Sequence, residues 1–257
     1  MFNDIRKIIE EVFSPSYVIT KPKSEEGVDG RIVAYVDKTS QISEQYRILR
    51  TNLYSISTEK PIKVIAITSS QSEEGKTTTA CNLAITLSWD TEKKIVLLDG
   101  DLRKPEVHTL FNLPRKPGLS DILLEKCEVA DLTVKPAIGN LYVIPSGSTI
   151  TNPAEALSYP RFKALIAELK VRFDYVIFDT PPTLSVADSS IIGSLCDGVI
   201  LIVKSEVTSK DIVGESFNLL KSTNAKPIAC VLTNFHAPFH YYFKYKSYYN
   251  YLYKPKR

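Results

Sequence analysis

One stretch of the chain, SSQSEEGKTTT, combines the residues that a phosphate-binding site needs. Gly75, Lys76 and Thr77 fit the end of the pattern G-x-x-x-x-G-K-[ST], and Ser70 stands where the first glycine is usual. Such a loop turns backbone N–H groups toward phosphate, while its lysine contacts the outer phosphates and its hydroxyl contacts magnesium. A strand-like run precedes the stretch and a helical pattern follows it, as this loop requires. We therefore predict a nucleotide site with the cofactor-binding residues Ser72, Glu74, Gly75, Lys76, Thr77 and Thr78.

Three aspartates follow apolar runs elsewhere in the chain. VLLDGDLRKP places Asp99 and Asp101 two residues apart, and VIFDTPP places Asp179 after four apolar or aromatic residues. Because alternate residues of a strand share a face, Asp99 and Asp101 are expected to converge on one site. Carboxylates there can hold magnesium or accept a proton from a nucleophile. A single aspartate at a strand end usually serves a turn or a cap, but three beside a phosphate loop indicate an active site.

Six apolar runs alternate with helical patterns from residue 62 onward. Strands that are apolar on both faces and alternate with helices indicate a parallel sheet that is covered on both sides. We therefore predict an α/β fold, a P-loop NTPase-type parallel β-sheet flanked by helices on both faces. One helix is expected to begin with Asn152 as N-cap, Pro153 at its first position and Glu155 at its third, within residues 152–170. The expected strands are residues 63–70, 93–101, 141–147, 173–182, 197–206 and 226–235.

Composition narrows the function class. Hydrophobic residues make up 44% of the 257 positions and charged residues 24%, as in an ordinary globular protein. The net charge of +3 gives no general reason to expect nucleic-acid binding. No run is long and apolar enough to cross a membrane and no signal-peptide core is present, so we expect a cytoplasmic protein. The cysteines lack metal-ligand spacing, and Cys81, Cys196 and Cys230 are expected to be buried free thiols.

The chain is expected to have three parts. Residues 1–41 form an N-terminal amphipathic helix and arm, residues 42–237 the P-loop domain, and residues 238–257 a flexible tail. Residues 1–13 place their apolar side chains on one helical face. This face is expected either to pack on its own domain or to contact a partner or a membrane.

The tail is rich in tyrosine and lysine. No acidic residue follows Glu215, so the end of the chain is basic and can attract anionic partners. Half of the 14 tyrosines of the chain lie within thirteen residues of this tail. They are Tyr241, Tyr242, Tyr245, Tyr248, Tyr249, Tyr251 and Tyr253.

Together these motifs resemble the bacterial tyrosine kinases, the BY-kinase family. SxxxxGKT, VLLDGDLR and VIFDTPP are similar to the Walker A, A′ and B motifs of the family, and SEQYRILRTNL matches its E-x-x-R-x-x-R motif. The tyrosine cluster is similar to the family's autophosphorylation tail. The resemblance covers roughly residues 32–253. It implies an ATP-dependent, non-specific protein-tyrosine kinase that autophosphorylates its tail in trans and regulates capsular or exopolysaccharide synthesis and export.

The resemblance also implies roles in nucleotide and metal binding. Lys76 would neutralise the β- and γ-phosphates of ATP. Thr77, Asp101 and Asp179 would hold Mg²⁺, directly or through water. Asn234, which follows the last strand, would contact the adenine.

Further roles concern the transfer step. Asp99 is the candidate to accept the phenolic proton, and the division of tasks between Asp99 and Asp101 stays open. Arg103 would orient this acidic pair or stabilise the transferring charge. The predicted catalytic residues are thus Lys76, Asp99, Asp101, Arg103 and Asp179.

Glu44, Arg47 and Arg50 share one face of a helix. Taken alone, this pattern also fits a solvated face with internal salt bridges. The resemblance implies instead that the motif joins subunits into a ring, in which each tail enters the active site of its neighbour. It further implies a membrane-bound activator of the polysaccharide co-polymerase type that recruits the kinase to the inner face of the membrane. Protein tyrosine substrates and a cognate phosphotyrosine phosphatase complete the expected partners.

The chain departs from the family pattern within the phosphate loop. Relatives typically carry Pro-Gly where this chain has Ser72 and Glu73. This replaces a residue that tolerates positive φ and adds a carboxylate near the triphosphate. Weaker nucleotide binding, or a loop shaped by a partner, would follow.

Two other functions stay open from the sequence. A partitioning ATPase of the deviant Walker A type would carry a lysine where this chain has Gln71. An ATP-gated scaffold could use its basic aromatic tail to bind anionic lipid or nucleic acid.

Overall fold

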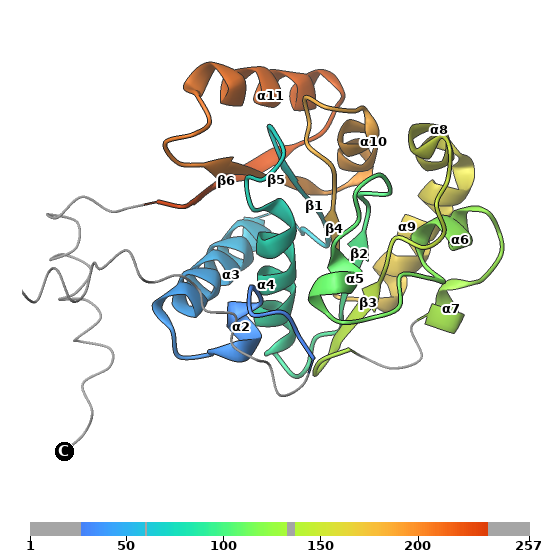
Figure 1. Ribbon diagram of the computed structural model, residues 1–257, viewed down its shortest axis with the longest axis horizontal. Coiled ribbons are helices and arrows are strands. Elements are labelled where there is room, and N and C mark those ends of the chain that lie inside the picture. Colours follow the sequence, from blue (N-terminus) through green and yellow to red (C-terminus); the bar gives the residue numbers. More distant parts are fainter. Residues whose placement is uncertain (1–26, 60, 133–136, 236–257) are drawn as a thin grey trace, which may run out of the picture.

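Six parallel strands form one sheet in the computed structural model, which describes residues 27–59, 61–132 and 137–235 (Figure 1). The expected helix of residues 1–13 and the tyrosine tail lie outside these residues. The strand order is β3-β2-β4-β1-β5-β6, and all neighbours are parallel. All six predicted strands are confirmed: β1 (Val64–Ser69), β2 (Ile95–Asp99), β3 (Leu141–Ile144), β4 (Tyr175–Asp179), β5 (Gly198–Lys204) and β6 (Pro227–Thr233).

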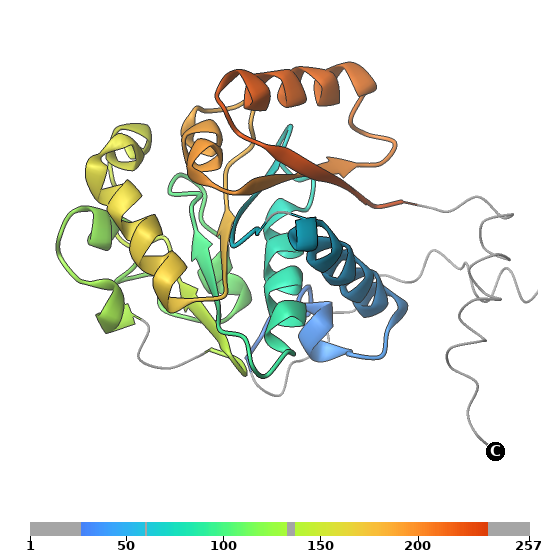
Figure 2. The ribbon, with the colours of Figure 1, turned by 180° about the vertical axis from the view of Figure 1, so that it is seen from behind.

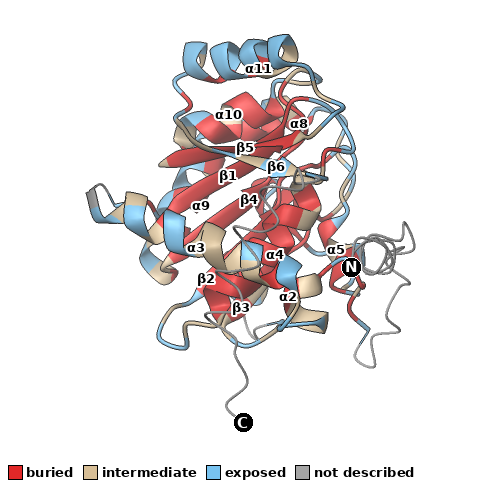
Figure 3. Ribbon diagram, turned by 90° about the vertical axis from the view of Figure 1, so that its left-hand side faces the viewer, coloured by how far each residue is buried: buried red, intermediate tan, exposed pale blue. Residues whose placement is uncertain are grey.

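Helices cover both faces of the sheet, as predicted, and each face has its own apolar core (Figures 2 and 3). No helix within the described ranges is long and apolar enough to cross a membrane. One face packs against α2 (Val33–Val36), α3 (Gln41–Glu59), α4 (Lys76–Ser88) and α5 (Val107–Leu110). The other packs against α6 (Leu119–Leu123), α7 (Val129–Leu132), α8 (Pro153–Ser158), α9 (Pro160–Arg172), α10 (Asp188–Leu195) and α11 (Lys210–Ser222).

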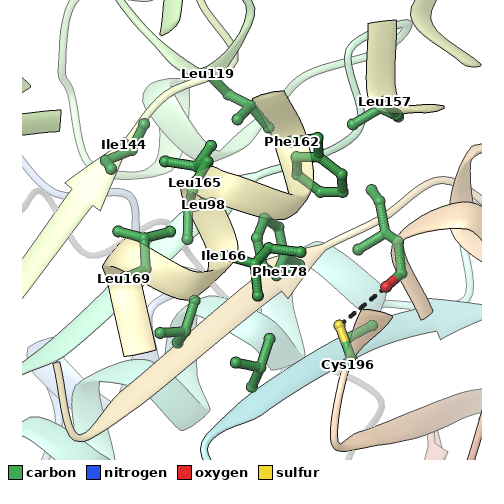
Figure 4. Close-up of a cluster of buried hydrophobic side chains, with 14 of the residues drawn as sticks. Leu98, Leu119, Ile144, Leu157, Phe162, Leu165, Ile166, Leu169, Phe178 and Cys196 are labelled. Carbon is green, nitrogen blue, oxygen red and sulfur yellow. Dashed lines mark hydrogen bonds between the residues drawn. The ribbon is translucent and has the colours of Figure 1, made fainter. Parts of the chain in front are cut away.

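The second of these cores is built around aromatic and aliphatic side chains from α9 and β4 (Figure 4). The rings of Phe162 and Phe178 meet edge to face with their centroids 5.7 Å apart. This arrangement is favourable for aromatic pairs beyond the area that they bury. Cys196 lies in the same core, where its thiol donates to the carbonyl of Ile192 at 3.2 Å.

The expectation for the cysteines is confirmed at Cys81 and Cys196, which are buried free thiols, and is wrong at Cys230. Cys230 lies in β6, the last strand at one edge of the sheet, where its side chain is exposed. An apolar sequence does not reveal whether a strand is central or at an edge, and an edge strand has a neighbour on one side only.

The folded domain begins earlier than residue 42. Ile32 and Ala34 have no exposed surface and belong to the core beside α4. The buried side chain of Asn82 in α4 binds this segment: its oxygen accepts from the N–H of Ala34 at 2.8 Å, and its amide donates to the carbonyl of Arg31 at 2.9 Å. The segment around Ile32 and Ala34 is therefore packed on the domain, where one buried amide satisfies the N–H of Ala34 and the carbonyl of Arg31.

The helix expected over residues 152–170 is divided in two at Tyr159. Tyr159 has φ −70° and ψ 150°, an extended conformation. Pro160 explains the break, since a proline disfavours helical geometry in the residue before it and cannot donate an N–H. Asn152 makes no side-chain cap and donates instead to Glu155 at 3.2 Å.

Candidate active site

The phosphate loop connects β1 to α4, the order that the sequence predicts. The strands β2, β4 and β1 are neighbours in the sheet, so their carboxyl ends lie side by side. Gly75 has a φ of 92°, the left-handed region that favours glycine, directly before α4 begins. The loop and the first turn of α4 therefore present backbone N–H groups at the same edge as the three aspartates.

Lys76 lies among these carboxylates. Its Nζ is 3.0 Å from Oδ2 of Asp101 and 3.8 Å from Oδ2 of Asp179. Its Nζ also lies 3.2 Å from the hydroxyl of Thr77. Asp99 and Asp179 occupy matched positions on neighbouring strands. The structure thus brings together Lys76, Thr77 and all three predicted aspartates.

Burial influences the protonation of Lys76, Asp99 and Asp179. Burial, with the charge of Asp179 as the next cause, raises the pKa of Asp99 well above its usual range. Burial also raises the pKa of Asp179 to about 6, although the attraction of Lys76 opposes this shift. For Lys76, burial disfavours the ammonium, but Asp179 and Asp101 outweigh it and the pKa rises. The lysine therefore stays charged, while Asp99 and Asp179 have raised pKa values and take up protons more readily than free aspartate.

Asp99 and Asp101 differ in their surroundings. Asp99 has no exposed surface, and its Oδ2 accepts from the N–H of Val107 at 3.1 Å. Asp101 lies nearer the surface and accepts from the N–H of Lys104 at 2.9 Å. Which of the two accepts the phenolic proton stays a prediction.

Several buried oxygens in the site have no hydrogen-bond partner. They include both carboxylate oxygens of Asp179 and Oδ1 of Asp99. Buried polar atoms normally have partners, and carboxylate oxygens in this state suit a hard cation or its water ligands. Across the described residues, no three His, Cys, Asp or Glu side chains gather closely enough to hold a metal by themselves. The carboxylates of Asp99 and Asp179 nevertheless fit a hard cation by their chemistry.

The chain is similar to known proteins. Residues 62–226 match the family model of an AAA domain. The tyrosine-protein kinase YwqD of Bacillus subtilis is 39% identical over 201 residues, which span 78% of this chain and 84% of that protein. The putative tyrosine-protein kinase CapB of Staphylococcus aureus is 30% identical over 238 residues, 91% of this chain and 97% of that protein. This chain belongs to the bacterial tyrosine kinases.

Solved structures agree with this assignment. The chimerical protein CapA2B2 superposes on the kinase with a TM-score of 0.76 at 30% identity, covering 90% of this chain and 99% of that one. The kinase domain of the Escherichia coli tyrosine kinase ETK gives a TM-score of 0.74 at 26% identity, covering 81% and 83%. The septum site-determining protein MinD of Pyrococcus horikoshii, at 20% identity and a TM-score of 0.57, shares the fold alone.

Arg103 of the kinase pairs with Asp188 rather than with Asp99 or Asp101. Its guanidinium donates two hydrogen bonds to the Asp188 carboxylate, at 2.9 and 3.1 Å. Asp188 is fully buried at the start of α10, so the pair joins the loop after β2 to the helix after β4. The sequence did not single out Asp188, because an acidic residue in the first turn of a helix is common. The roles expected for Arg103, orienting the acidic pair or stabilising the transferring charge, stay predictions.

The Glu44, Arg47 and Arg50 face of α3 makes contacts within the kinase chain. Arg47 pairs with Glu44 at 2.5 Å, and Arg50 donates to the carbonyl of Thr86 at 2.7 Å. The guanidinium carbons of Arg47 and Arg50 lie 4.8 and 6.0 Å from the centre of the Trp89 ring. These contacts hold α3 on the end of α4. A role between subunits stays a prediction.

The unusual phosphate loop of the kinase carries backbone strain. Glu73 has a φ of 62°, the left-handed region that costs a residue with a Cβ roughly 1–2 kcal/mol. Ser72 and Glu73 are exposed, whereas Thr78 is half-buried in α4. Asn234, the expected adenine contact, is exposed directly after β6, at the same edge of the sheet as the loop. Its contact with the base stays a prediction.

Replacing Asp179 by Asn should change stability in a pH-dependent way. The pKa of Asp179 is raised from 3.8 to about 6, so the folded state holds the proton more firmly than the unfolded chain between these values. This carboxyl therefore favours folding below the lower value, and its contribution is lost as the pH rises through 6. Relative to the parent chain, we expect Asp179→Asn to gain on the order of 2–3 kcal/mol of unfolding free energy between about pH 4.5 and about pH 8.

Urea unfolding at both pH values measures this difference. Asp211→Asn, which neutralises an exposed carboxylate in α11, is the matched control and should show no such gain. The same relative stability of Asp179→Asn at both pH values would contradict the prediction.

Replacing Glu73 by Gly should relieve strain and remove a carboxylate near the phosphates. We expect the unfolding free energy to rise by about 1 kcal/mol and ADP affinity to rise several-fold. Calorimetric titration with ADP and a thermal melt measure the two effects. Glu73→Ala removes the charge but keeps a Cβ at positive φ, so it separates the two causes. Unchanged ADP affinity in Glu73→Gly would show that the loop sequence does not limit binding.

Proposed function

We propose that the kinase binds ATP with Mg²⁺ and phosphorylates its own C-terminal tyrosines in trans. The observation that carries this proposal is the position of Lys76, which lies 3.0 Å from Asp101 and 3.8 Å from Asp179 at the end of the phosphate loop. A lysine for the phosphates, together with carboxylates for a metal and a proton, is the set that phosphoryl transfer needs.

Each side chain has its own task in this proposal. Lys76 exchanges Asp101 for the β- and γ-phosphates, which compensate its charge in place of the carboxylate. The Thr77 hydroxyl and the carboxylate of Asp179 would hold Mg²⁺, which when bound would neutralise charge on the phosphates. A phenol has a pKa of ~10 and needs a base to attack at neutral pH, and Asp101 or Asp99 accepts its proton.

The tail supplies the acceptor phenols. Its seven tyrosines, Tyr241 to Tyr253, stand among lysines and without acidic residues. Positive charge favours approach to a site built of phosphates and carboxylates. Each phosphate adds about −1.5 to −2 charges, which weakens this attraction and ends the association. The number of phosphates on the tail can therefore set the strength of association in graded steps.

The biological setting is proposed from the relatives. We place the kinase in the cytoplasm, where a membrane-bound activator of the polysaccharide co-polymerase type recruits it to the membrane and a cognate phosphatase reverses its reaction. The control of capsular or exopolysaccharide synthesis fits this setting. In support, a Klebsiella pneumoniae protein that is 32% identical over 189 residues is a putative tyrosine-protein kinase in the cps region.

Replacing Lys76 by Met should abolish phosphorylation of the tail. Lys76 is the only cation that contacts Asp101 and Asp179 within the described part of the chain, and its loss removes the ligand of the outer phosphates. We expect phosphate on residues 241–253 of the parent chain after incubation with ATP and Mg²⁺, and none in Lys76→Met. Mass spectrometry of the tail measures this.

A chain with all seven tail tyrosines replaced by Phe controls for phosphate elsewhere. Mixing this chain with Lys76→Met tests transfer in trans, because the first supplies an active site and the second supplies the acceptors. A parent chain that stays unmodified, even with the activator's cytoplasmic peptide, would exclude the kinase and favour a nucleotide-gated scaffold.

We also propose that Glu44, Arg47 and Arg50 join subunits into a ring. Replacing all three with Ala should reduce the assembly to monomers in light scattering. Arg161→Ala removes a surface ion pair with Glu128 on the opposite side of the sheet and serves as control. A variant that melts at a lower temperature but keeps its assembled mass would contradict the proposal. These residues would then act only within the chain, through their contacts with Trp89 and Thr86.

A further inference from the structure

Glu74 directly precedes Gly75 in the phosphate loop, but its side chain is buried and makes its hydrogen bonds within the protein. It is only 2% exposed. One carboxylate oxygen accepts from the backbone N–H of Gln71 at 2.8 Å, and the other accepts from the hydroxyl of Thr208. A carboxylate can accept at both oxygens, so Glu74 joins its own loop to the segment between β5 and α11.

The main chain of Glu74 is held from a second direction. Thr233, the last residue of β6, donates its hydroxyl to the carbonyl of Glu74 at 2.7 Å. Its methyl carbon lies only 3.3 Å from the place that a Cβ on Gly75 would take. Thr233 therefore packs closely on the glycine that turns the chain into α4.

These contacts act on a loop that is strained by its own sequence. Gly75 has a φ of 92°, which a glycine adopts readily, but Glu73 has a φ of 62°, a conformation that a residue with a Cβ seldom adopts. Such a conformation persists only where surrounding contacts determine it. The hydroxyls of Thr208 and Thr233 reach the loop from segments that follow β5 and end β6, more than 130 residues along the chain.

We propose that Thr208 and Thr233 are positioning residues for the nucleotide. They hold Glu74, and through it the backbone N–H groups that precede α4, in the shape that receives phosphate. Neither needs to touch the nucleotide. Since Asn234 follows Thr233, the same residue also fixes the distance between the proposed adenine contact and the phosphate loop. This inference rests on the nucleotide-binding part of the proposed function and is independent of the transfer to tyrosine.

Paired substitutions separate the hydroxyl from the rest of each side chain. Thr→Val keeps the branched shape and removes the donor, whereas Thr→Ser keeps the donor and removes the methyl group. We expect Thr208→Val and Thr233→Val each to weaken ADP binding about tenfold, the effect of losing roughly one hydrogen bond. Thr208→Ser and Thr233→Ser should stay within about twofold of the parent chain. Thr223→Val, which removes a hydroxyl bonded to a carbonyl of α11, is the matched control.

Titration calorimetry with ADP and Mg²⁺ measures affinity, and steady-state kinetics separates KM for ATP from kcat. The proposal expects a raised KM with kcat changed by less than about twofold, because a positioning contact is made equally in the ground and transition states. It is overturned if both Val variants bind ADP within about twofold of the parent chain, whatever their melting temperatures. It is equally overturned if the Ser variants lose as much affinity as the Val variants.

Should Thr233→Val fail to fold, the Thr208 pair in the loop before α11 decides the question alone. A parent chain that binds ADP but leaves its tail unphosphorylated would refute the transfer proposal and still allow this comparison.

Discussion

A single ammonium group, that of Lys76, lies among the carboxyl groups that are buried at the carboxyl edge of the sheet. Asp99 and Asp179 have no exposed surface, and Asp101 has very little. Burial and mutual repulsion raise the pKa values of Asp99 and Asp179, so these two carboxyls favour their neutral forms. In the proposed function, phosphates that attract Lys76 draw this cation away from the carboxylates, and a metal ion held by Thr77 and Asp179 would replace its charge. Nucleotide and metal binding would then be linked through one lysine.

The rest of the fold keeps this edge in place. The three strands β2, β4 and β1 are adjacent, and apolar cores on both faces of the sheet fix their register. The Arg103–Asp188 pair ties the loop after β2 to α10, and Asn82 binds the N-terminal segment to α4. Thr208 and Thr233 secure the phosphate loop from the other half of the sheet. The Arg103 and threonine contacts act on loops that carry site residues, and the Asn82 contact holds the segment that packs beside α4.

The same side chains can serve two levels of organisation. Arg47 and Arg50 lie over Trp89 and hold α3 on α4, which is a use within one chain. If they also meet a second subunit, assembly and the placement of α4 are connected, since α4 begins at Lys76. In such an interface, contacts between subunits would be connected to the phosphate site through α4.

The sequence by itself determined the six strands, the phosphate loop and the family, because apolar periodicity and the spacing of Gly75, Lys76, Thr77 and the aspartates are local properties. It also showed that Glu73 stands where relatives typically have a glycine tolerant of positive φ, and the structure then placed Glu73 at a φ of 62°. The partner of Arg103, the exposure of Cys230 and the attachment of residues 28–41 were decided only by the tertiary structure. The partner of Arg103 depends on which distant segments meet, and the exposure of Cys230 depends on the position of its strand at the edge of the sheet. The attachment of residues 28–41 depends on a buried polar group that needs partners. The hold of Thr208 and Thr233 on Glu74 belongs to the same class, because a hydroxyl has no distinctive sequence pattern until its acceptor is placed beside it.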